Sequence, residues 1–239
     1  MPRSANSEED AEPIQREAII YQALGQHPCI AQCLSIGEMD HVDIKYYPNG
    51  DLETYLRQHR DRVTRWQRAK WFEQIIEGVD FIHGHGVIHS DLALRQYLVD
   101  DNLNALLADF NASQLGEHVA LGYEKATHCL PRDYTDLNTV ASDLFALGST
   151  LYELCTGTAA YNEIYPLEPE DVLHSSDPEV ILARVYRKQQ ADAKVEQLFA
   201  QEIFPDVSHL QGGRIILGLW RCEFPSTKAA LLSFKSPRA

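Results

Sequence analysis

One short run, HSDLALRQ at residues 89–96, constrains the fold of this chain more than any other feature of it. A second run, DFN at residues 109–111, follows after two apolar segments, 97–99 and 103–108. These segments are joined through Asp101-Asn102, and this pattern predicts a β-hairpin. The polar residues of both runs are therefore expected at strand ends and in loops.

A long amphipathic helix is predicted before the first run, from about Arg65 to His83. Thr64 and Gln67 have the spacing of a capping box at its start, and Gly84 and Gly86 end it. The helix therefore leads directly into the loop that carries the first run. Its apolar residues recur every three or four positions, which predicts one buried face: Trp66, Ala69, Phe72, Ile76, Val79 and Ile82.

Further helices are predicted after the second run. Asp143 to Cys155 carries leucines at 144, 147, 151 and 154 on one stripe and stops at Gly157. Two more helices are expected, at about 178–188 and 191–200. The chain after the turn Pro48-Asn49-Gly50 is therefore expected to be mainly helical.

The amino-terminal part has a different pattern. Residues 1–13 are polar and acidic with little to bury, so we expect a disordered leader there. A helix is predicted from Gln15 to Leu24, where Gly25 and Pro28 end it. Ile30–Ile36 and His41–Tyr47 read as short strands. The expected organisation is a leader at 1–13, a small helix-and-strand part at 14–47, and a helical part at 48–239.

Composition narrows the classes of partner and the cellular compartment. The net charge of −14 over 239 residues argues against nucleic acid and against an anionic membrane as partners, because both attract basic surfaces. The five cysteines show no paired CxxC spacing, which suits a reducing compartment. The start of the chain has no apolar core of a signal peptide, and no apolar run approaches the length of a membrane span. We therefore expect a cytoplasmic protein.

In order and spacing, Asp91, Gln96 and Asp109 resemble the catalytic centre of the protein kinases, where a catalytic-loop Asp and Asn precede an Asp-Phe-Gly run. The segment YYPNGDL at 46–52 resembles the family's hinge, and SDLFALG at 142–148 resembles the buried helix whose Asp holds the catalytic-loop backbone. The resemblance covers nearly all of the chain from Glu17 onward. It implies an α+β fold, with a mainly helical carboxy-terminal lobe and a truncated amino-terminal lobe that lacks its first strands.

The resemblance also implies roles for named residues. Asp91 would accept or orient the proton of a substrate hydroxyl, while Asp109 and Gln96 would hold Mg²⁺ through oxygen atoms. The adenine of ATP would contact the hinge backbone at residues 45–47, which are Lys45, Tyr46 and Tyr47. Glu17 would belong to the helix whose Glu pairs with the ATP-binding lysine. The implied cofactors are ATP and Mg²⁺, and the implied partner is a protein substrate or another protein.

The chain departs from the family's pattern at several positions. It contains no glycine-rich GxGxxG run, and no lysine precedes Glu17, so weak binding of the ATP phosphates is expected. Gln96 replaces Asn and is one methylene longer. Pro131-Arg132 stands where Pro-Glu is usual, and Phe224-Pro225-Ser226 stands where the family's partner arginine would precede Pro. In this alignment with the family, both halves of a buried ion pair are replaced together.

Three functions fit these residues. The first is a protein kinase, for Ser/Thr or Tyr, whose amino-terminal strands are missing from this chain. The second is a pseudokinase that acts as a binding or scaffolding module. The third is a small-molecule phosphotransferase, which the Asp143 helix and the hinge-like segment disfavour. Ala93 and Arg95 resemble the catalytic loop of the tyrosine-specific kinases.

Overall fold

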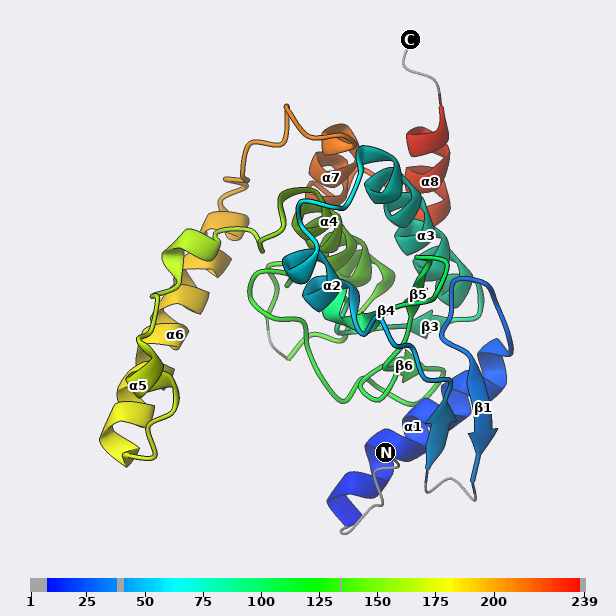
Figure 1. Cartoon of the computed structure of the whole chain (residues 1–239), viewed down its shortest axis with the longest axis horizontal. Coiled ribbons are helices and arrows are strands. Elements are labelled where there is room, and N and C mark those ends of the chain that lie inside the picture. The colour runs from blue at the N-terminus through cyan, green and yellow to red at the C-terminus, as the bar shows by residue number, and fades with distance from the viewer. Residues whose placement is uncertain (1–7, 38–40, 134, 237–239) are drawn as a thin grey trace.

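The computed structural model describes residues 8–37, 41–133 and 135–236. Its elements follow the order of the chain (Figure 1): α1 (Glu8–Leu24), β1 (Cys33–Ile36), β2 (Val42–Ile44), α2 (Leu52–Gln58), α3 (Arg65–Gly84), β3 (Val87–Ile88), η1 (Leu94–Gln96), β4 (Tyr97–Val99), β5 (Ala105–Leu107), β6 (Gln114–Leu115), α4 (Val140–Thr156), η2 (Asn162–Ile164), α5 (Glu170–Leu173), α6 (Pro178–Ala200), α7 (Gly213–Trp220) and α8 (Thr227–Lys235).

Helices build the larger part of the molecule. In Figure 1, α3 and α4 lie at its centre, with α7 packed against α4 and α8 against α3. Helix α1 and the hairpin β1–β2 form a smaller part at the amino-terminal end, whereas α5 and much of α6 extend away from the central helices. The structure is therefore α+β with few and short strands, as the sequence predicts.

The strands pair in three antiparallel two-stranded ladders: β1 with β2, β3 with β6 and β4 with β5. The β4–β5 ladder is the hairpin predicted between the two polar runs. The smaller part is joined to it, because Leu107 N donates to Cys29 O and Ala31 N donates to Leu107 O, each at 2.8 Å. Backbone hydrogen bonds thus hold the first segments of the chain against the strand that precedes Asp109.

Helix α3 forms where the sequence predicts it, and Thr64 Oγ1 caps it by accepting from Gln67 N at 3.1 Å. The Gln67 side chain completes no capping box, because its Nε2 donates to Leu103 O at 2.8 Å instead. Trp66 was expected on the buried face of this helix, yet 87% of it is exposed. Trp71, about one and a half turns later, is fully buried. Trp66 lies in the first turn of α3, and its side chain faces solvent.

Two expectations about helix boundaries are wrong. Helix α1 begins at Glu8 and includes Pro13, so residues 8–13 are helical where a disordered leader was expected, and residues 1–7 lie outside the described residues. The two helices expected at 178–188 and 191–200 are one continuous helix, α6. Gln189 and Gln190 between them are good helix formers, and no Gly or Pro interrupts the run.

Among the described residues, no helix is both long enough and apolar enough to cross a membrane.

Candidate functional site

Asp91 lies at the centre of a small polar cluster in the loop after β3. Arg95 Nη2 donates to its Oδ2 at 2.6 Å, and Gln96 Nε2 donates to the same oxygen at 2.6 Å. Asp91 and Arg95 are each about a quarter exposed, at 25% and 27% of their side-chain surface. The carboxylate is therefore oriented by two neighbours and still reached by solvent.

The catalytic-loop segment and Asp109 are held together by the backbone. Ala108 N donates to Gln96 O at 2.8 Å, and the His89 ring nitrogen Nε2 bonds Ala108 O at 3.1 Å. Gln96 thus contacts Asp91 through its side chain and the residue before Asp109 through its main chain. These hydrogen bonds place Asp91, Gln96 and Asp109 close to one another.

Asp109 has a left-handed backbone, with φ of 62°, which is uncommon for a residue other than glycine. Its carboxylate accepts no hydrogen bond from the described residues, and neither does Gln96 Oε1. The oxygen atoms of these two side chains are the kind of ligand that Mg²⁺ prefers. No group of three His, Cys, Asp or Glu side chains in the described part of the chain is placed to hold a metal ion. The donors fit a Mg²⁺ ion that takes its other ligands from water and phosphate.

A buried carboxylate, that of Asp143, holds the backbone of the loop that carries Asp91. Asp143, at the start of α4, is fully buried, as expected. Its Oδ2 accepts from His89 N at 2.7 Å and its Oδ1 accepts from Ser90 N at 3.0 Å. Ser90 has a φ of 69°, so Asp143 holds a strained backbone turn directly before Asp91.

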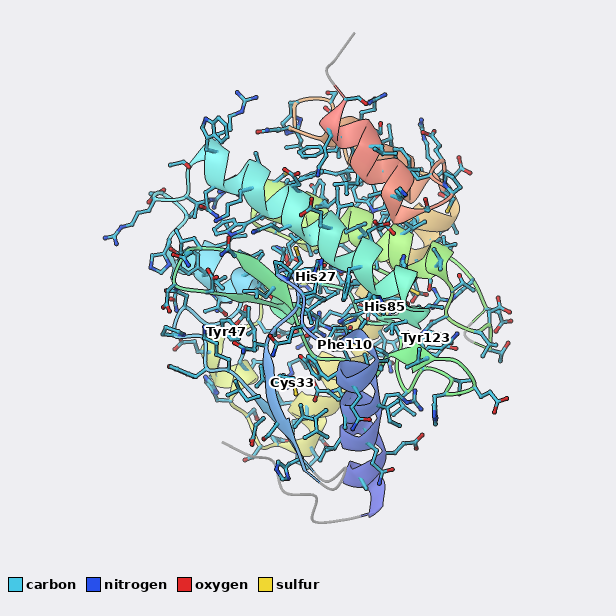
Figure 2. The ribbon with its side chains drawn as sticks, turned by 90° about the vertical axis from the view of Figure 1, so that its right-hand side faces the viewer. His27, Cys33, Tyr47, His85, Phe110 and Tyr123 are labelled. Carbon is cyan, nitrogen blue, oxygen red and sulfur yellow. The ribbon has the colours of Figure 1, made fainter. Side chains whose placement is uncertain are left out.

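Aromatic rings connect this loop to α1. The Phe110 ring lies 5.5 Å from the His89 ring and meets Tyr21 edge to face at 5.1 Å between centroids. Figure 2 shows Phe110 next to α1, with Cys33 on the neighbouring strand β1. The residue predicted to pair with the ATP-binding lysine, Glu17, is half-buried on the same helix. Burial and then the charge of Glu17 raise the pKa of the Tyr21 hydroxyl well above its ordinary value.

The three hinge residues take different positions. Tyr46 is 82% exposed, whereas Tyr47 is buried and its hydroxyl oxygen accepts from Gln32 N at 2.9 Å. Lys45 is joined to Gln32 through its backbone N–H, and its Nζ lies 5.8 Å from the centre of the Tyr47 ring. The backbone N–H groups of Tyr46 and Tyr47 donate to no group among the described residues, whereas that of Lys45 is already used.

One buried residue of this region was not predicted. Arg16 on α1 is only 3% exposed, and its Nη1 donates to Ser113 O at 2.7 Å and to Val119 O at 2.5 Å. Burial lowers the pKa of its guanidinium. Arg16 therefore ties α1 to the segment that follows Asp109. The signal in the sequence was its place on the helix face that also carries Ile20 and Leu24.

Replacing Arg16 by methionine should lower the free energy of unfolding by about 1.5–3 kcal/mol, because the buried carbonyl oxygen of Ser113 and the partly buried one of Val119 lose a charged donor. Urea denaturation measures this. Gln15→Met is the matched control, since Gln15 is the exposed neighbour on the same helix. An equal effect of both substitutions would show that the contacts of Arg16 contribute nothing.

Downstream of Asp109, an unexpected ion pair holds the segment that leads to α4. Arg132 Nη2 donates to Glu124 Oε2 at 2.9 Å and also to Asn138 Oδ1. The Glu124 side chain is fully buried and that of Arg132 is 9% exposed. The sequence suggested that both halves of an ion pair were replaced here, but Arg132 has a different carboxylate partner.

Comparison with known proteins adds a second line of evidence. The family model described as protein tyrosine and serine/threonine kinase matches residues 1–201. The human NUAK family SNF1-like kinase 1 is 32% identical over 170 residues, which cover 65% of this chain and 24% of that protein. The RGS domain-containing serine/threonine-protein kinase A of Dictyostelium discoideum is 28% identical over 183 residues, which cover 72% of this chain and 16% of that protein.

CBL-interacting protein kinase 10 of Oryza sativa subsp. japonica is also similar, with 28% identity over 159 residues, 62% of this chain and 35% of that protein. The match to these relatives spans between 16% and 35% of their own lengths.

Proposed function

We propose that this chain, which belongs to the protein kinase family, transfers a phosphoryl group from ATP to a hydroxyl group of a protein. One observation carries the proposal. Gln96 contacts Asp91 through its side chain and the backbone next to Asp109 through its carbonyl oxygen, so the loop before β4 and the segment after β5 bring the three residues close to one another. The acidic chain and its five free thiols fit the reducing cytoplasm, which is the location we propose.

The roles follow from the positions of the side chains. Asp91 accepts the hydrogen bond of the substrate hydroxyl and orients its oxygen towards the phosphorus atom. Asp109 and Gln96 Oε1 hold Mg²⁺, which neutralises charge on the phosphate oxygens when bound. The hinge backbone at Tyr46 and Tyr47, whose N–H groups donate to no described residue, contacts the adenine. Because the chain carries no glycine-rich run to enclose the phosphates, we expect low affinity for ATP.

A pseudokinase that acts as a binding module is the second candidate, and the Arg95 contact favours it. Arg95 Nη2 donates to both oxygens of Asp91, so the carboxylate that would receive a proton is already paired with a cation. Such a module would keep the fold and bind a protein without transferring phosphate.

Labelled ATP and a peptide library containing serine, threonine and tyrosine separate the two candidates. With Mg²⁺ present, the unmodified chain should label peptides, and Asp91→Asn should reduce the rate about a hundredfold or more, because it removes the base. Asp101→Asn is the matched control, since Asp101 is an exposed residue of the hairpin turn. Labelling by the unmodified chain no faster than by Asp91→Asn would reject the kinase and leave the binding module.

A further inference from the structure

A cavity of about 520 Å³ opens beside the catalytic loop. Its wall is formed by α2 and the turn after it, the start of α3, the loop residues Ala93 to Arg95, the segment after Asp109, the end of α4 and one face of α6. Its volume lies within the range of typical ligand pockets. Its cationic side chains come from five of these segments: Arg57, Arg60, Arg68, Arg95, Lys125 and Lys188. We call this cavity the basic pocket.

The charge of the basic pocket is opposite to that of the whole chain. Six cationic side chains line it against three carboxylates, Glu53, Glu153 and Asp192, whereas the chain carries a net charge of −14. In an acidic protein, side chains scattered over the surface would not be expected to bring six cations into one cavity from segments so distant in the sequence. Clefts lined by one sign of charge raise the local concentration of ligands of the other sign.

Most of these cations are not neutralised by neighbours. Among the described residues, Arg57, Arg60 and Lys125 form no ion pair, and all three are exposed. Arg68 donates to a carbonyl oxygen, that of Leu154, at 2.6 Å. Only Lys188 has a carboxylate partner within the pocket wall, Asp192 at 2.7 Å. The uncompensated guanidinium and ammonium groups are thus available to an anion from outside.

Arg95 joins the basic pocket to the catalytic loop. Its Nη2 holds Asp91, while its Nη1 and Nε form no hydrogen bond with the described residues. Guanidinium groups bind carboxylates and phosphates through two parallel N–H donors. Because Arg95 contacts Asp91 and also lines the basic pocket, an anion bound by Arg95 lies close to Asp91. A residue near the acceptor hydroxyl in the same peptide can therefore place its side chain in the pocket.

We propose that the basic pocket binds an anionic side chain, phosphorylated or carboxylate, of the protein whose hydroxyl group faces Asp91. The inference rests on the proposed function, because it assigns the substrate class of that site. The basic pocket selects substrate segments that are acidic or already phosphorylated. It excludes lysine- and arginine-rich segments, because Arg57 and Arg60 repel their charge.

Fluorescence anisotropy with labelled peptides tests this in the absence of ATP. The peptides place phosphoserine, glutamate or lysine at one position at a time around a central serine, in a background of glycine and alanine. At one or more positions, the anionic peptide should bind about tenfold more tightly than the lysine peptide. The difference should shrink as salt is raised, because the pocket is open to solvent.

The double variant Arg57→Gln/Arg60→Gln should lose that preference. Lys194→Gln/Arg221→Gln removes the same charge from exposed positions outside the pocket and should retain it. Equal binding of anionic and lysine peptides at every position, or an unchanged preference in Arg57→Gln/Arg60→Gln, would overturn the proposal. So would inorganic phosphate that binds as tightly as the best peptide, because the pocket would then serve a small anion.

The two proposals fail separately. Binding is measured without nucleotide, so an absence of phosphoryl transfer rejects the proposed function and leaves the peptide preference intact. Transfer without any preference for anionic peptides rejects only the assignment of the basic pocket.

Discussion

Replacing Asp143 by alanine is expected to lower the free energy of unfolding by about 3–5 kcal/mol, because a buried charge network loses its central acceptor. Two buried backbone N–H groups, of His89 and Ser90, lose their partner. His83 Nε2, which lies 2.9 Å from the same carboxylate, loses its partner as well. The left-handed turn at Ser90 then loses both of its backbone N–H anchors, so the position of Asp91 should be disturbed together with stability.

Urea denaturation followed by circular dichroism measures the effect. Asp143→Asn keeps an acceptor oxygen of the same size, so it should retain the fold and cost less than alanine. Asp136→Ala, at an exposed position in the segment before α4, is the control. An effect of Asp143→Ala no larger than that of Asp136→Ala would contradict the anchoring role. If the alanine variant does not fold, the comparison between Asp143→Asn and Asp136→Ala still decides.

The elements around Asp143 were predictable because each depends on local spacing. The hairpin 97–107 follows from two apolar segments and a turn, and α4 follows from a leucine stripe that ends at Gly157 with a φ of 83°. The closeness of Asp91 and Asp109 then follows from the protein kinase fold, which the order and spacing of those elements resemble. Local rules fail at Trp66, since whether a neighbour covers the first turn of a helix is decided by distant parts of the chain.

The rest of the site depends on contacts between distant residues. Nothing near Arg16 in the sequence indicates that it reaches Ser113, and nothing near Arg57 indicates that Lys188 lines the same cavity. Arg95 was recognised by its motif, yet the motif does not reveal that it holds Asp91. Polar residues on an apolar face, such as Arg16, are the one local signal of buried charge. The helical periodicity of the sequence does not indicate which residue such a buried charge contacts.

The buried pair of Arg132 and Glu124 gives the second large effect. Arg132→Ala is expected to lower the free energy of unfolding by about 3–5 kcal/mol, because Glu124 would remain fully buried without its cation. Double-mutant cycles with Glu124→Gln measure the coupling between the two side chains. Arg187→Ala is the matched control, since the Arg187–Glu168 pair lies at the surface and should contribute much less.

The loss should depend on pH in a defined direction. Burial already raises the pKa of Glu124, against the opposing effect of Arg132. The folded state therefore holds the Glu124 proton more tightly than the unfolded state, and the stability that this proton contributes is lost as pH rises through the folded pKa. Removing Arg132 raises that pKa further. Arg132→Ala should therefore cost more at about pH 8 than at about pH 5, because the fraction of Glu124 that is protonated, and so carries no buried charge, grows as pH falls.

Urea denaturation of Arg132→Ala and the unmodified chain at both pH values checks this sign. Adding Glu124→Gln to Arg132→Ala should recover part of the stability at about pH 8 and little at about pH 5, because the amide cannot ionise. A cost of Arg132→Ala that is equal at both pH values would mean that Glu124 is not left as a buried carboxylate. The segment between Asp109 and α4 would then be held by the contact of Arg132 with Asn138.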